Sequence, residues 1–533
     1  MKKISAIILA FLIAVTAFGG CGKKQNENGG AAENADTKQA ETQNETASDS
    51  GIISVFSYKP DTFCPVLSQN AANLQMLGIL YDGLIELDDT LTPQPCLAES
   101  WSVSENGREW TVNLKSGVLW HDGSGFEARD AVYTVNQIKR VPESLYYYNV
   151  SEIASITAEG QNKLKIKLTA PDPNFINLLY FPIVKYSSGN INAEEYRPNG
   201  TGPYAFEDRN DGNMFYLVRN DNWWGGKAKN KEIRVRLLPD RDTALYAFSS
   251  GSIDITSAEN LEWGKFADAA TSTYKETKTP IYNFLGINHK NVLLAMDEVR
   301  LAISEVINRQ EIVDEAAMGY ADAANAPVRK EWYVSEGQDF NFVQNVNDAK
   351  KILLDNEWTE NDGKYRKKVG RKEVRLKFDI LINEDNTVRS RAAEVIKKNL
   401  EEFGFEISIT KVSDEEYDKR ISSGRYDAFL GSYSLAPNLN FDFMIGDGNI
   451  FHYKNDELNY VLGELKNKTE KSEIVQKYAE TVNLLNQLCP IVGLYFENGV
   501  VIYNNKIQGD VTPSYFDLYR NIEKLYTKEV QSK

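Results

Sequence analysis

Residues 374–383 read Val374-Arg-Leu-Lys-Phe-Asp-Ile-Leu-Ile-Asn383, in which apolar side chains take every second position. A period of two predicts a strand with one buried face. A helical period follows, because apolar residues between Ala392 and Phe403 recur at spacings of three and four. Gly404 is placed to end that helix, since glycine readily adopts the backbone conformation found at helix C-termini.

Three further segments continue this order. Residues 405–409 alternate again, residues 414–423 predict a short polar helix, and residues 426–433 predict a buried strand. The order strand, helix, strand, helix, strand favours a parallel sheet with right-handed crossovers. Ligands of such open sheets bind beyond the carboxyl ends of the strands. The segment from Tyr433 to Asp442 lies at that end.

The first half of the chain alternates in another style. Residues 110–114 and 164–168 each predict a short half-buried strand, and Gly, Asn and Asp turns lie between them. Residues 130–140 predict a helix, because Ala131, Val132, Val135 and Ile138 would form one apolar face. This pattern predicts an α+β subdomain.

The first twenty residues predict a signal peptide. Lys2 and Lys3 precede a mostly apolar run, residues 4–18, which two glycines and Cys21 follow. The run is about 15 residues long, shorter than the 18 or more usually needed to cross a bilayer. No later segment reaches that length without a charge, so we expect no integral membrane protein.

Cys21 is expected to carry a lipid anchor. A cysteine after small residues, followed at once by polar sequence, resembles the lipobox of bacterial lipoproteins, in which this cysteine is acylated. Such lipoboxes usually have Leu three residues before the cysteine, where this chain has Phe18, so ordinary secretion stays an alternative. Acylation on several chains would hold the protein far more firmly than one myristoyl group does.

Residues 22–50 predict a flexible tether. They contain no aromatic residue, no proline and no aliphatic residue larger than alanine, so they cannot bury a core. A low-complexity interaction tail is the alternative. The remaining residues, 51–533, are too many for one compact core and predict two or three subdomains.

Charge excludes some partners. The formal net charge is −16 and the isoelectric point is near 5. Nucleic acid and anionic lipid both favour a basic face, and no basic stripe stands out in the sequence. We therefore expect no nucleic-acid partner and a membrane contact through the lipid anchor only.

The cysteines predict little disulfide bonding. With Cys21 assigned to lipid, Cys64, Cys96 and Cys489 remain, so at most one disulfide can form within the chain. Buried thiols that behave as small hydrophobic side chains are the favoured interpretation.

Nothing in the sequence supports catalysis. The three histidines, His121, His289 and His452, are widely separated, and no metalloprotease, nucleophile-elbow or phosphate-loop motif is present. We expect no enzyme, no metal site and no cofactor. A secreted hydrolase stays open as an alternative.

Blocks of sequence along the chain resemble one known family. They include Leu80-Tyr-Asp-Gly-Leu-Ile-Glu-Leu-Asp88, Leu97-Ala-Glu-Ser-Trp101, Trp120-His-Asp-Gly123, Ala128-Arg-Asp-Ala-Val132, Thr201-Gly-Pro-Tyr204, Arg219-Asn-Asp-Asn-Trp-Trp-Gly-Gly226, Ser250-Gly-Ser-Ile-Asp254, Val299-Arg-Leu-Ala302, Asn308-Arg309 and Asp348-Ala-Lys-Lys-Ile-Leu-Leu354. Together they closely resemble extracellular solute-binding family 5, which includes the oligopeptide-, dipeptide- and nickel-binding proteins of ABC importers. The blocks follow the order of the family over nearly all of the mature chain.

The resemblance implies a periplasmic-binding-protein-like type II fold, α/β and α+β, with two lobes joined at a hinge. It places the signal peptide at 1–20, the lipidated Cys and tether at 21–50, lobe I at 51–87, 191–283 and 497–533, an inserted small α+β subdomain at 88–190, and lobe II at 284–496. The hinge is expected where the chain crosses between the lobes, near 284–288 and 493–497. A ligand that bridges the lobes would stabilise the closed form.

The resemblance also implies a pocket. Peptide-binding relatives contact the ligand amino terminus with an aspartate in a W-x-x-D-Y-x-D-P motif, and the corresponding stretch here is Gly431-Ser-Tyr-Ser-Leu-Ala-Pro-Asn-Leu-Asn440. Leu435 or Ala436 takes the aspartate position, which weakens the case for a free-amine peptide unless Asp442 or another carboxylate substitutes. The expected ligand-binding residues are Gly431, Ser432, Tyr433, Ser434, Tyr147, Tyr148, Trp332 and Tyr58. The scarcity of histidine argues against nickel.

The function expected from these features is that of a lipid-anchored, extracytoplasmic binding protein on the outer face of the bacterial cytoplasmic membrane. It would capture a peptide or other small solute as a monomer and deliver it to the permease subunits of an ABC importer. A surface lipoprotein of the same fold that senses peptides or serves adhesion is the alternative.

Overall fold

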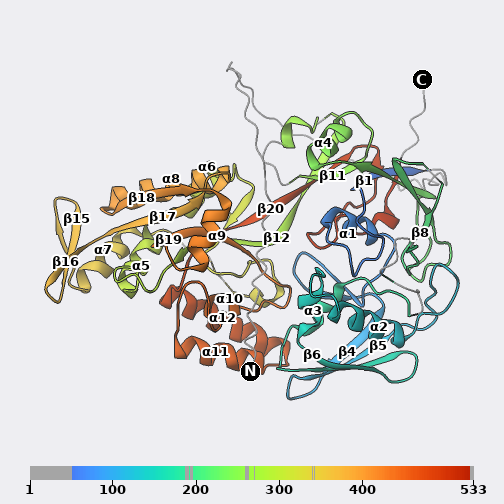
Figure 1. The fold of residues 1–533 in the computed structure, drawn as a ribbon, viewed down its shortest axis with the longest axis horizontal. Helices are drawn as coiled ribbons and strands as arrows, with labels where there is room; N and C mark the ends of the chain where they lie inside the picture. The colour runs from blue at the N-terminus through green and yellow to red at the C-terminus, as the bar shows by residue number, and fades with distance from the viewer. Residues whose placement is uncertain are drawn as a thin grey trace, which may run out of the picture.

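The computed structural model describes residues 51–186, 191, 196–209, 211–258, 263–268, 270–338, 340 and 343–527. The predicted signal peptide, Cys21 and the tether lie outside these ranges. Figure 1 shows two bodies joined by a pair of long strands, β12 (Ser272–Ile287) and β20 (Val492–Asn504). Within the described ranges, no helix combines the length and the apolarity that a bilayer crossing requires.

The body that begins the chain contains a four-stranded sheet in the order β1 (Ile52–Tyr58), β10 (Glu232–Leu238), β9 (Met214–Arg219) and β8 (Tyr204–Glu207). β1 runs parallel to β10, and the other pairs are antiparallel. Two helices, two hairpins and two short 3-10 turns complete this body: α1 (Ala71–Leu77), α4 (Arg241–Ser249), β2 (Ile85–Leu87) with β3 (Pro93–Pro95), β21 (Ile507–Gln508) with β22 (Tyr526–Thr527), η2 (Trp263–Lys265) and η4 (Ile522–Lys524).

The strands predicted at 110–114 and 164–168 and the helix predicted at 130–140 are confirmed, in an α+β arrangement. Its sheet has the order β4 (Ala98–Val103), β5 (Glu109–Leu114), β7 (Lys163–Leu168) and β6 (Ile153–Ala158), all antiparallel. The predicted helix is α2 (Ala128–Lys139), and α3 (Tyr147–Ser151) and η1 (Phe175–Tyr180) follow it. Side chains of this subdomain and of the four-stranded sheet share one hydrophobic core, so both form lobe I.

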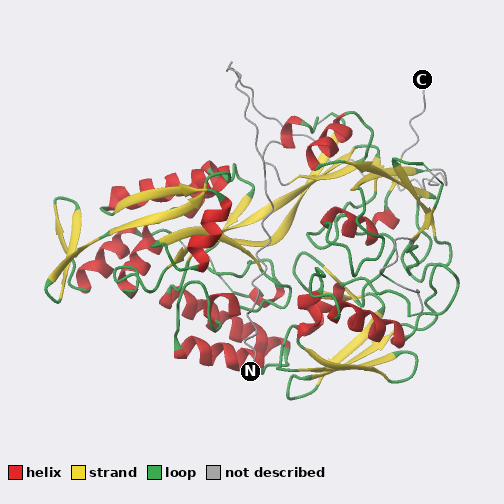
Figure 2. Cartoon of the chain, in the orientation of Figure 1, coloured by secondary structure: helices red, strands yellow, loops and turns green. Residues whose placement is uncertain are grey.

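Lobe II contains the predicted parallel strands. They belong to a sheet that continues from lobe I through the two long strands, in the order β11 (Ile255–Ala258), β20, β12, β19 (Ala428–Ser434), β17 (Lys377–Asn383) and β18 (Glu406–Val412), and β13 (Ala321–Ala323) pairs with β20; β11 lies in lobe I. β17 runs parallel to both β18 and β19, as the alternation of strands and helices predicts. Helices cover both faces: α5 (Asp297–Val306), α6 (Arg309–Glu315), α7 (Val346–Asp355), α8 (Thr387–Phe403), α9 (Asp414–Ser422), α10 (Asp442–Ile445), α11 (Asp456–Lys466) and α12 (Lys471–Leu488), with the short η3 (Tyr333–Ser335) (Figure 2).

One predicted strand is divided. Residues 374–383 form the end of β16 (Lys372–Arg375) and all of β17, with a break at Leu376. The alternation continues across the break, but the backbone partners change, because β16 pairs with β15 (Lys364–Val369) and β17 pairs with β18. Periodicity reports which face is buried and cannot show such a change of partner. Gly404 ends α8 with a φ of +123°, as expected.

The two lobes are linked where β12 and β20 cross between them. The antiparallel pairing runs from Ser272–Asn504 to Lys278–Asn498, is interrupted, and resumes at Tyr282–Phe496. This interruption lies just before the segment 284–288 that the sequence placed at the hinge. We retain the domain boundaries given above as a proposal.

Candidate ligand-binding site

The predicted ligand segment forms the carboxyl end of β19. Gly431 to Ser434 pair with β12 from Phe284 to Ile281. A side chain at Gly431 would not fit, because a Cβ atom there would lie 2.7 Å from the Phe429 ring. On its other side, β19 pairs with β17 only at Ala428 and Phe429, so residues 430–434 have a strand partner on one side only among the described residues.

The side chains of this segment are held by lobe II. Tyr433 stacks on Phe443, with ring centroids 4.1 Å apart and an interplanar angle of 9°. Arg389 at the start of α8 donates through Nη2 to Ser432 Oγ at 2.9 Å. Ser434 is exposed and pairs with Ile281 through its backbone. The stack and the hydrogen bond fix Tyr433 and Ser432 before any ligand arrives.

Residues that follow β19 contact the inserted subdomain. Asn438 is 7% exposed, and its Nδ2 donates to Asp172 Oδ2 at 2.7 Å. Asn174 Nδ2 donates to Asn438 O at 3.1 Å, and Asn177 Nδ2 donates to Pro437 O at the same distance. We call this contact, formed by Asp172, Asn174 and Asn177 with Pro437 and Asn438, the joint.

Three tyrosines surround the joint. Tyr148 Oη donates to Asn438 Oδ1 at 3.3 Å. Tyr478 on α12 accepts from Asn174 Nδ2 at 2.8 Å, and Tyr333 donates to Asn174 Oδ1. Asn174 is thus bonded to three parts of lobe II, so the joint depends on amide groups that both donate and accept.

The charge at the joint is negative. Burial raises the pKa of Asp172 to about 6, while hydrogen bonds from Asn438 and the Asn174 backbone act in the opposite direction. Lys466 lowers this pKa and Asp442 raises it, but Lys466 itself pairs with Asp442 at 3.1 Å. The pKa of Tyr433 is raised, first by burial and then by the charge of Asp442. A cationic ligand group would be stabilised at such a place.

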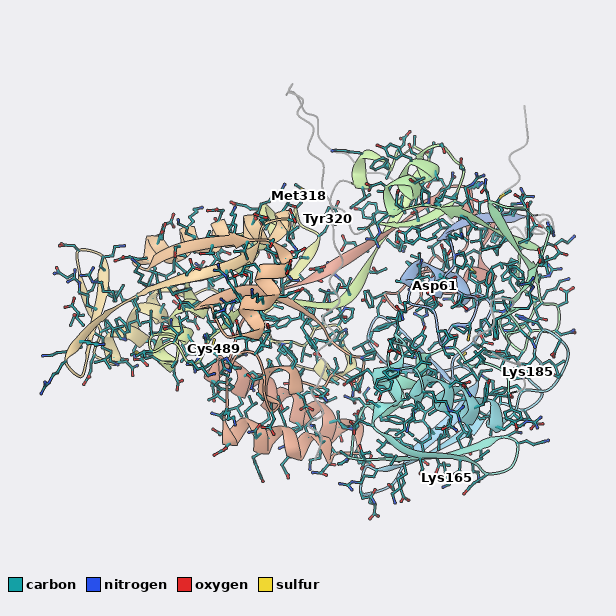
Figure 3. The ribbon with its side chains drawn as sticks, viewed as in Figure 1. Asp61, Lys165, Lys185, Met318, Tyr320 and Cys489 are labelled. Atoms are coloured by element: carbon teal, nitrogen blue, oxygen red, sulfur yellow. The ribbon has the colours of Figure 1, made fainter. Side chains whose placement is uncertain are left out.

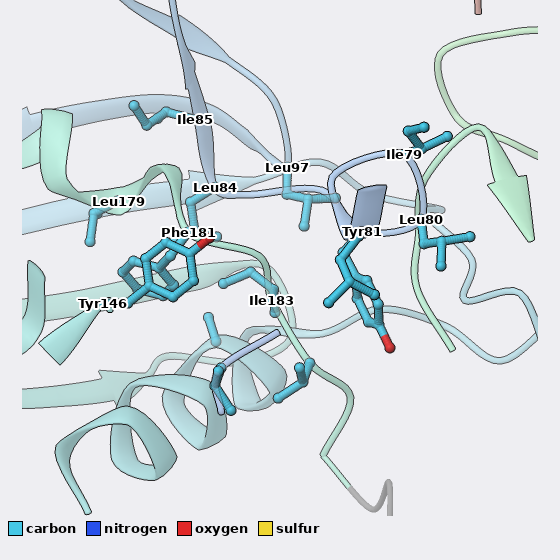
Figure 4. Close-up of a cluster of buried hydrophobic side chains, with 14 of the residues drawn as sticks. Ile79, Leu80, Tyr81, Leu84, Ile85, Leu97, Tyr146, Leu179, Phe181 and Ile183 are labelled. Carbon is cyan, nitrogen blue, oxygen red and sulfur yellow. The ribbon is translucent and has the colours of Figure 1, made fainter. Parts of the chain in front are cut away.

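A cavity of about 100 Å³ lies in lobe I, which is room for about three water molecules. Its lining includes Tyr146, Tyr180, Phe516, Asp82, Asp517 and Arg520. Tyr180 packs edge-on against Phe516 with centroids 5.3 Å apart, and Phe516 also packs against a hydrophobic cluster that lies mainly in lobe II. Figure 4 shows Tyr146 directed into the core beside Phe181 and Leu179.

The predicted site residues divide into three groups. Tyr148 and Tyr433 are brought together, close enough for the charge of one to affect the pKa of the other. Tyr147 is exposed, whereas its neighbour Tyr146 is buried and lines the cavity. Gly431, Ser432 and Ser434 lie on the same strand as Tyr433.

Two predicted site residues lie elsewhere. Trp332 is 2% exposed and packs on Phe496 with centroids 5.4 Å apart, so it is enclosed, and the adjacent Tyr333 reaches the joint instead. Tyr58 packs beside Phe56 in the cluster under α4. Cys21 lies outside the described residues.

Little in the sequence indicates the remaining joint residues. Asp172 and Asn174 occur in Ala170-Pro-Asp-Pro-Asn174, which predicts a turn and no more. Asn438 lies inside the predicted segment 431–440, but only the fold shows that it faces Asp172.

The chain is similar to known proteins over most of its length. Residues 92–448 match the sequence profile described as bacterial extracellular solute-binding proteins, family 5 Middle. The oligopeptide-binding protein AppA of Bacillus subtilis is 24% identical over 555 residues, 98% of each chain. Heme-binding protein A of Haemophilus influenzae is 22% identical over 537 residues, 92% of this chain and 95% of its own.

A solved structure has the same fold. The ABC transporter substrate binding protein CtaP of Listeria monocytogenes superposes with a TM-score of 0.74 at 22% identity, over 90% of this chain and all of the other. This likeness confirms the expected fold class, periplasmic-binding-protein-like type II.

Proposed function

The chain belongs to the bacterial extracellular solute-binding proteins of family 5, and on that premise we propose that it captures a peptide between its lobes and delivers it to an ABC permease. The resemblance found in the sequence is confirmed at the level of the family. The peptide, the lipid anchor at Cys21, the monomeric state and the site residues belong to the proposal.

One observation carries the choice of a peptide. Residues 430–434 of β19 have a strand partner on one side only among the described residues, and they lead directly into the joint. An extended peptide backbone can add to such a half-paired strand, which gives affinity without dependence on side chains. The sugar ring of a carbohydrate or a flat tetrapyrrole cannot form this ladder.

Asp172 supports a ligand with a free amino terminus. Its side chain is half-buried at the joint, burial raises the pKa of its carboxyl group, and no described Lys, Arg or His forms an ion pair with it. Asp442 lies close enough to raise its pKa. These two carboxylates would substitute for the aspartate that peptide-binding relatives have where this chain has Leu435 or Ala436. A ligand ammonium would offset the cost of burying the Asp172 charge.

The proposal includes closure of the two lobes around the ligand. The ligand would contact β19 in lobe II and the inserted subdomain in lobe I, so it binds the closed form better than the open form. The interruption between β12 and β20 would absorb the rotation. The permease would recognise the closed form.

The test begins with the chain from residue 21 onward, carrying Cys21→Ser. Native mass spectrometry looks for co-purified ligand, and thermal-shift titration follows with pools of free and N-acetylated peptides, with haem and with sugars. We expect melting temperatures that rise with the concentration of free peptides. N-acetylation or Asp172→Asn should weaken binding at least about tenfold, because each removes one partner of a buried charge pair. Asp314→Asn, an exposed change on α6, is the matched control.

Two outcomes would change the proposal. Binding of haem or a sugar with no response to any peptide would retain the family and reject the peptide. High selectivity for one peptide would favour the alternative, a sensing or adhesion lipoprotein.

The lipid anchor is tested separately, by mass spectrometry of the mature amino terminus from the native membrane. An unmodified Cys21 would reject the anchor.

A further inference from the structure

A strongly basic ribbon stands at one end of the molecule. β15 and β16 form it, with β14 (Thr359–Asn361) along one edge. Residues 364–377, which include β15, β16 and Lys377 at the start of β17, contain eight basic side chains and one acidic side chain, a net charge of +7. The whole chain carries −16, which leaves −23 for the remainder. The ribbon is therefore opposite in charge to the rest of the protein.

Half of the basic groups have carboxylate partners. The pairs are Lys367–Glu298 at 2.7 Å, Arg366–Glu373 at 3.2 Å, Arg375–Glu373 at 3.9 Å and Lys377–Glu406 at 3.9 Å. Four others are exposed and form no ion pair with any described carboxylate: Lys364, Lys368, Arg371 and Lys372. Three of these four lie at the turn between β15 and β16, so the strongest uncompensated charge is at the tip.

The ribbon has no apolar anchor on its surface. Its one aromatic residue, Tyr365, is 3% exposed and stacks on Phe403 with centroids 5.1 Å apart and an interplanar angle of 10°. Val369 and Val374 are half-buried. Protein interfaces depend on a few aromatic or arginine anchors seated in pockets, whereas a charged lipid surface attracts each basic side chain almost independently. The ribbon fits the second kind of partner.

The position of the ribbon in the molecule also favours contact with a membrane surface. β15 and β16 lie at the far end of lobe II along the longest axis, and β1, where the described chain begins, lies in the other lobe (Figure 1). Charges are screened within about 8 Å at physiological ionic strength. An end-on approach would therefore bring the basic tip to a membrane while lobe I stays beyond the screening distance.

We propose that the β15–β16 ribbon docks on anionic lipid headgroups of the membrane that contains the permease. This rests on the proposed extracytoplasmic function but requires no acyl chain. From the net charge of −16 we expected no contact between the protein body and anionic lipid. That charge is a sum over the whole chain, so it does not show that the ribbon is positive.

The experiment uses the chain from residue 21 onward with Cys21→Ser, so that no lipid anchor contributes. Co-sedimentation is measured with vesicles of equimolar phosphatidylglycerol and phosphatidylcholine, and with phosphatidylcholine alone. One variant carries Lys368→Gln, Arg371→Gln and Lys372→Gln. The control carries Lys163→Gln, Lys165→Gln and Lys167→Gln, which removes three exposed lysines from β7 in the other lobe (Figure 3).

We expect binding to the anionic vesicles only, weakened by added salt. The affinity of the ribbon variant for these vesicles should fall about fivefold for each basic group removed, about a hundredfold in all. The control should bind as the parent protein does. Equal losses in both variants, or no binding of the parent protein, would overturn the proposal. Binding to soluble polyphosphate without binding to vesicles would also overturn it, in favour of a wall polymer. Peptide titrations on the same preparations report on the transport function independently.

Discussion

Asn438 Nδ2 donates a hydrogen bond to Asp172 Oδ2 across 2.7 Å, although 266 positions separate the two residues. The bond joins the segment after β19 in lobe II to the turn before η1 in the inserted subdomain. It places an amide donor on the Asp172 carboxyl group, whose pKa is raised by burial.

Replacing Asn438 should favour the open form. Asn438→Ala removes the donor to Asp172 and the acceptor of Tyr148. A hydrogen bond to a charged group contributes about 1.5–3 kcal/mol, so peptide affinity should fall about tenfold or more. Small-angle scattering should show a larger radius of gyration for the ligand-free variant.

Asn459→Ala is the matched control for that variant, because Asn459 is exposed on α11 and is not one of the joint residues. If both variants scatter and bind alike, the joint does not hold the lobes together.

Stability should fall as pH rises from about 4 to about 7. Burial raises the pKa of Asp82 and Asp172 to about 6 and, with the nearby Glu86, that of Asp517 to about 7. In this range the folded chain retains protons that the unfolded chain has released, so the free energy of unfolding decreases with pH and levels off above about 7. Melting temperatures at pH 5, 6 and 7 measure the slope.

Asp517→Asn should flatten part of that slope, since an amide does not titrate. Asp314→Asn should leave the slope unchanged, because this exposed carboxylate lies far from the cavity on α6. An identical slope in the parent and the Asp517 variant would show that this carboxyl group does not titrate in the window.

Arg329 should be essential to the stability of β12 and β20 where these strands cross between the lobes. It is 2% exposed, and its guanidinium donates to Thr279 O on β12, to Glu497 O on β20 and to Asp322 Oδ2 on β13. Arg329→Gln should lower the free energy of unfolding by about 2–4 kcal/mol, because buried acceptors lose a charged donor.

Arg329→Lys should recover only part of this loss, since a single ammonium cannot reproduce the fork of the guanidinium. Lys330→Gln, whose side chain is 70% exposed, should change the midpoint of denaturant unfolding little. Full recovery by lysine would show that charge alone matters at this position.

The three described cysteines should behave as unreactive thiols. Cys64, Cys96 and Cys489 are buried and unpaired with one another, and Figure 3 locates Cys489 within lobe II. Burial raises the pKa of Cys64 to about 12 and that of Cys489 to about 11, so almost no thiolate exists at neutral pH. The folded Cys21→Ser protein should react slowly with a disulfide reagent, and three thiols should appear in guanidinium. One thiol in guanidinium would reveal a disulfide.

Gly404 should tolerate no side chain. Its φ is +123°, and a Cβ atom would lie 2.4 Å from the Gly363 carbonyl oxygen. Gly404→Ala should therefore destabilise lobe II by about 1–3 kcal/mol. Gly463→Ala, inside α11 with open space around it, should stabilise by about 0.5–1 kcal/mol. Chemical denaturation followed by tryptophan fluorescence measures both.

Periodicity was sufficient for several elements of each lobe. The alternation in 377–383 and 405–409, the helical spacing before Gly404 and the strands at 110–114 and 164–168 were all predicted correctly, because each depends on local burial that repeats every two or three to four residues. The family could also be recognised, since its motifs are contiguous stretches of sequence.

The joint and the half-paired strand depend on contacts between distant residues. Asp172 meets Asn438 only after lobe I and lobe II have each folded and the crossing strands have set their distance. Likewise, Trp332 and Tyr333 are neighbours in sequence, yet packing on Phe496 encloses one while the other reaches Asn174. Hydrophobic patterns record which side of an element is buried, whereas the partner of a polar side chain is chosen by the tertiary arrangement.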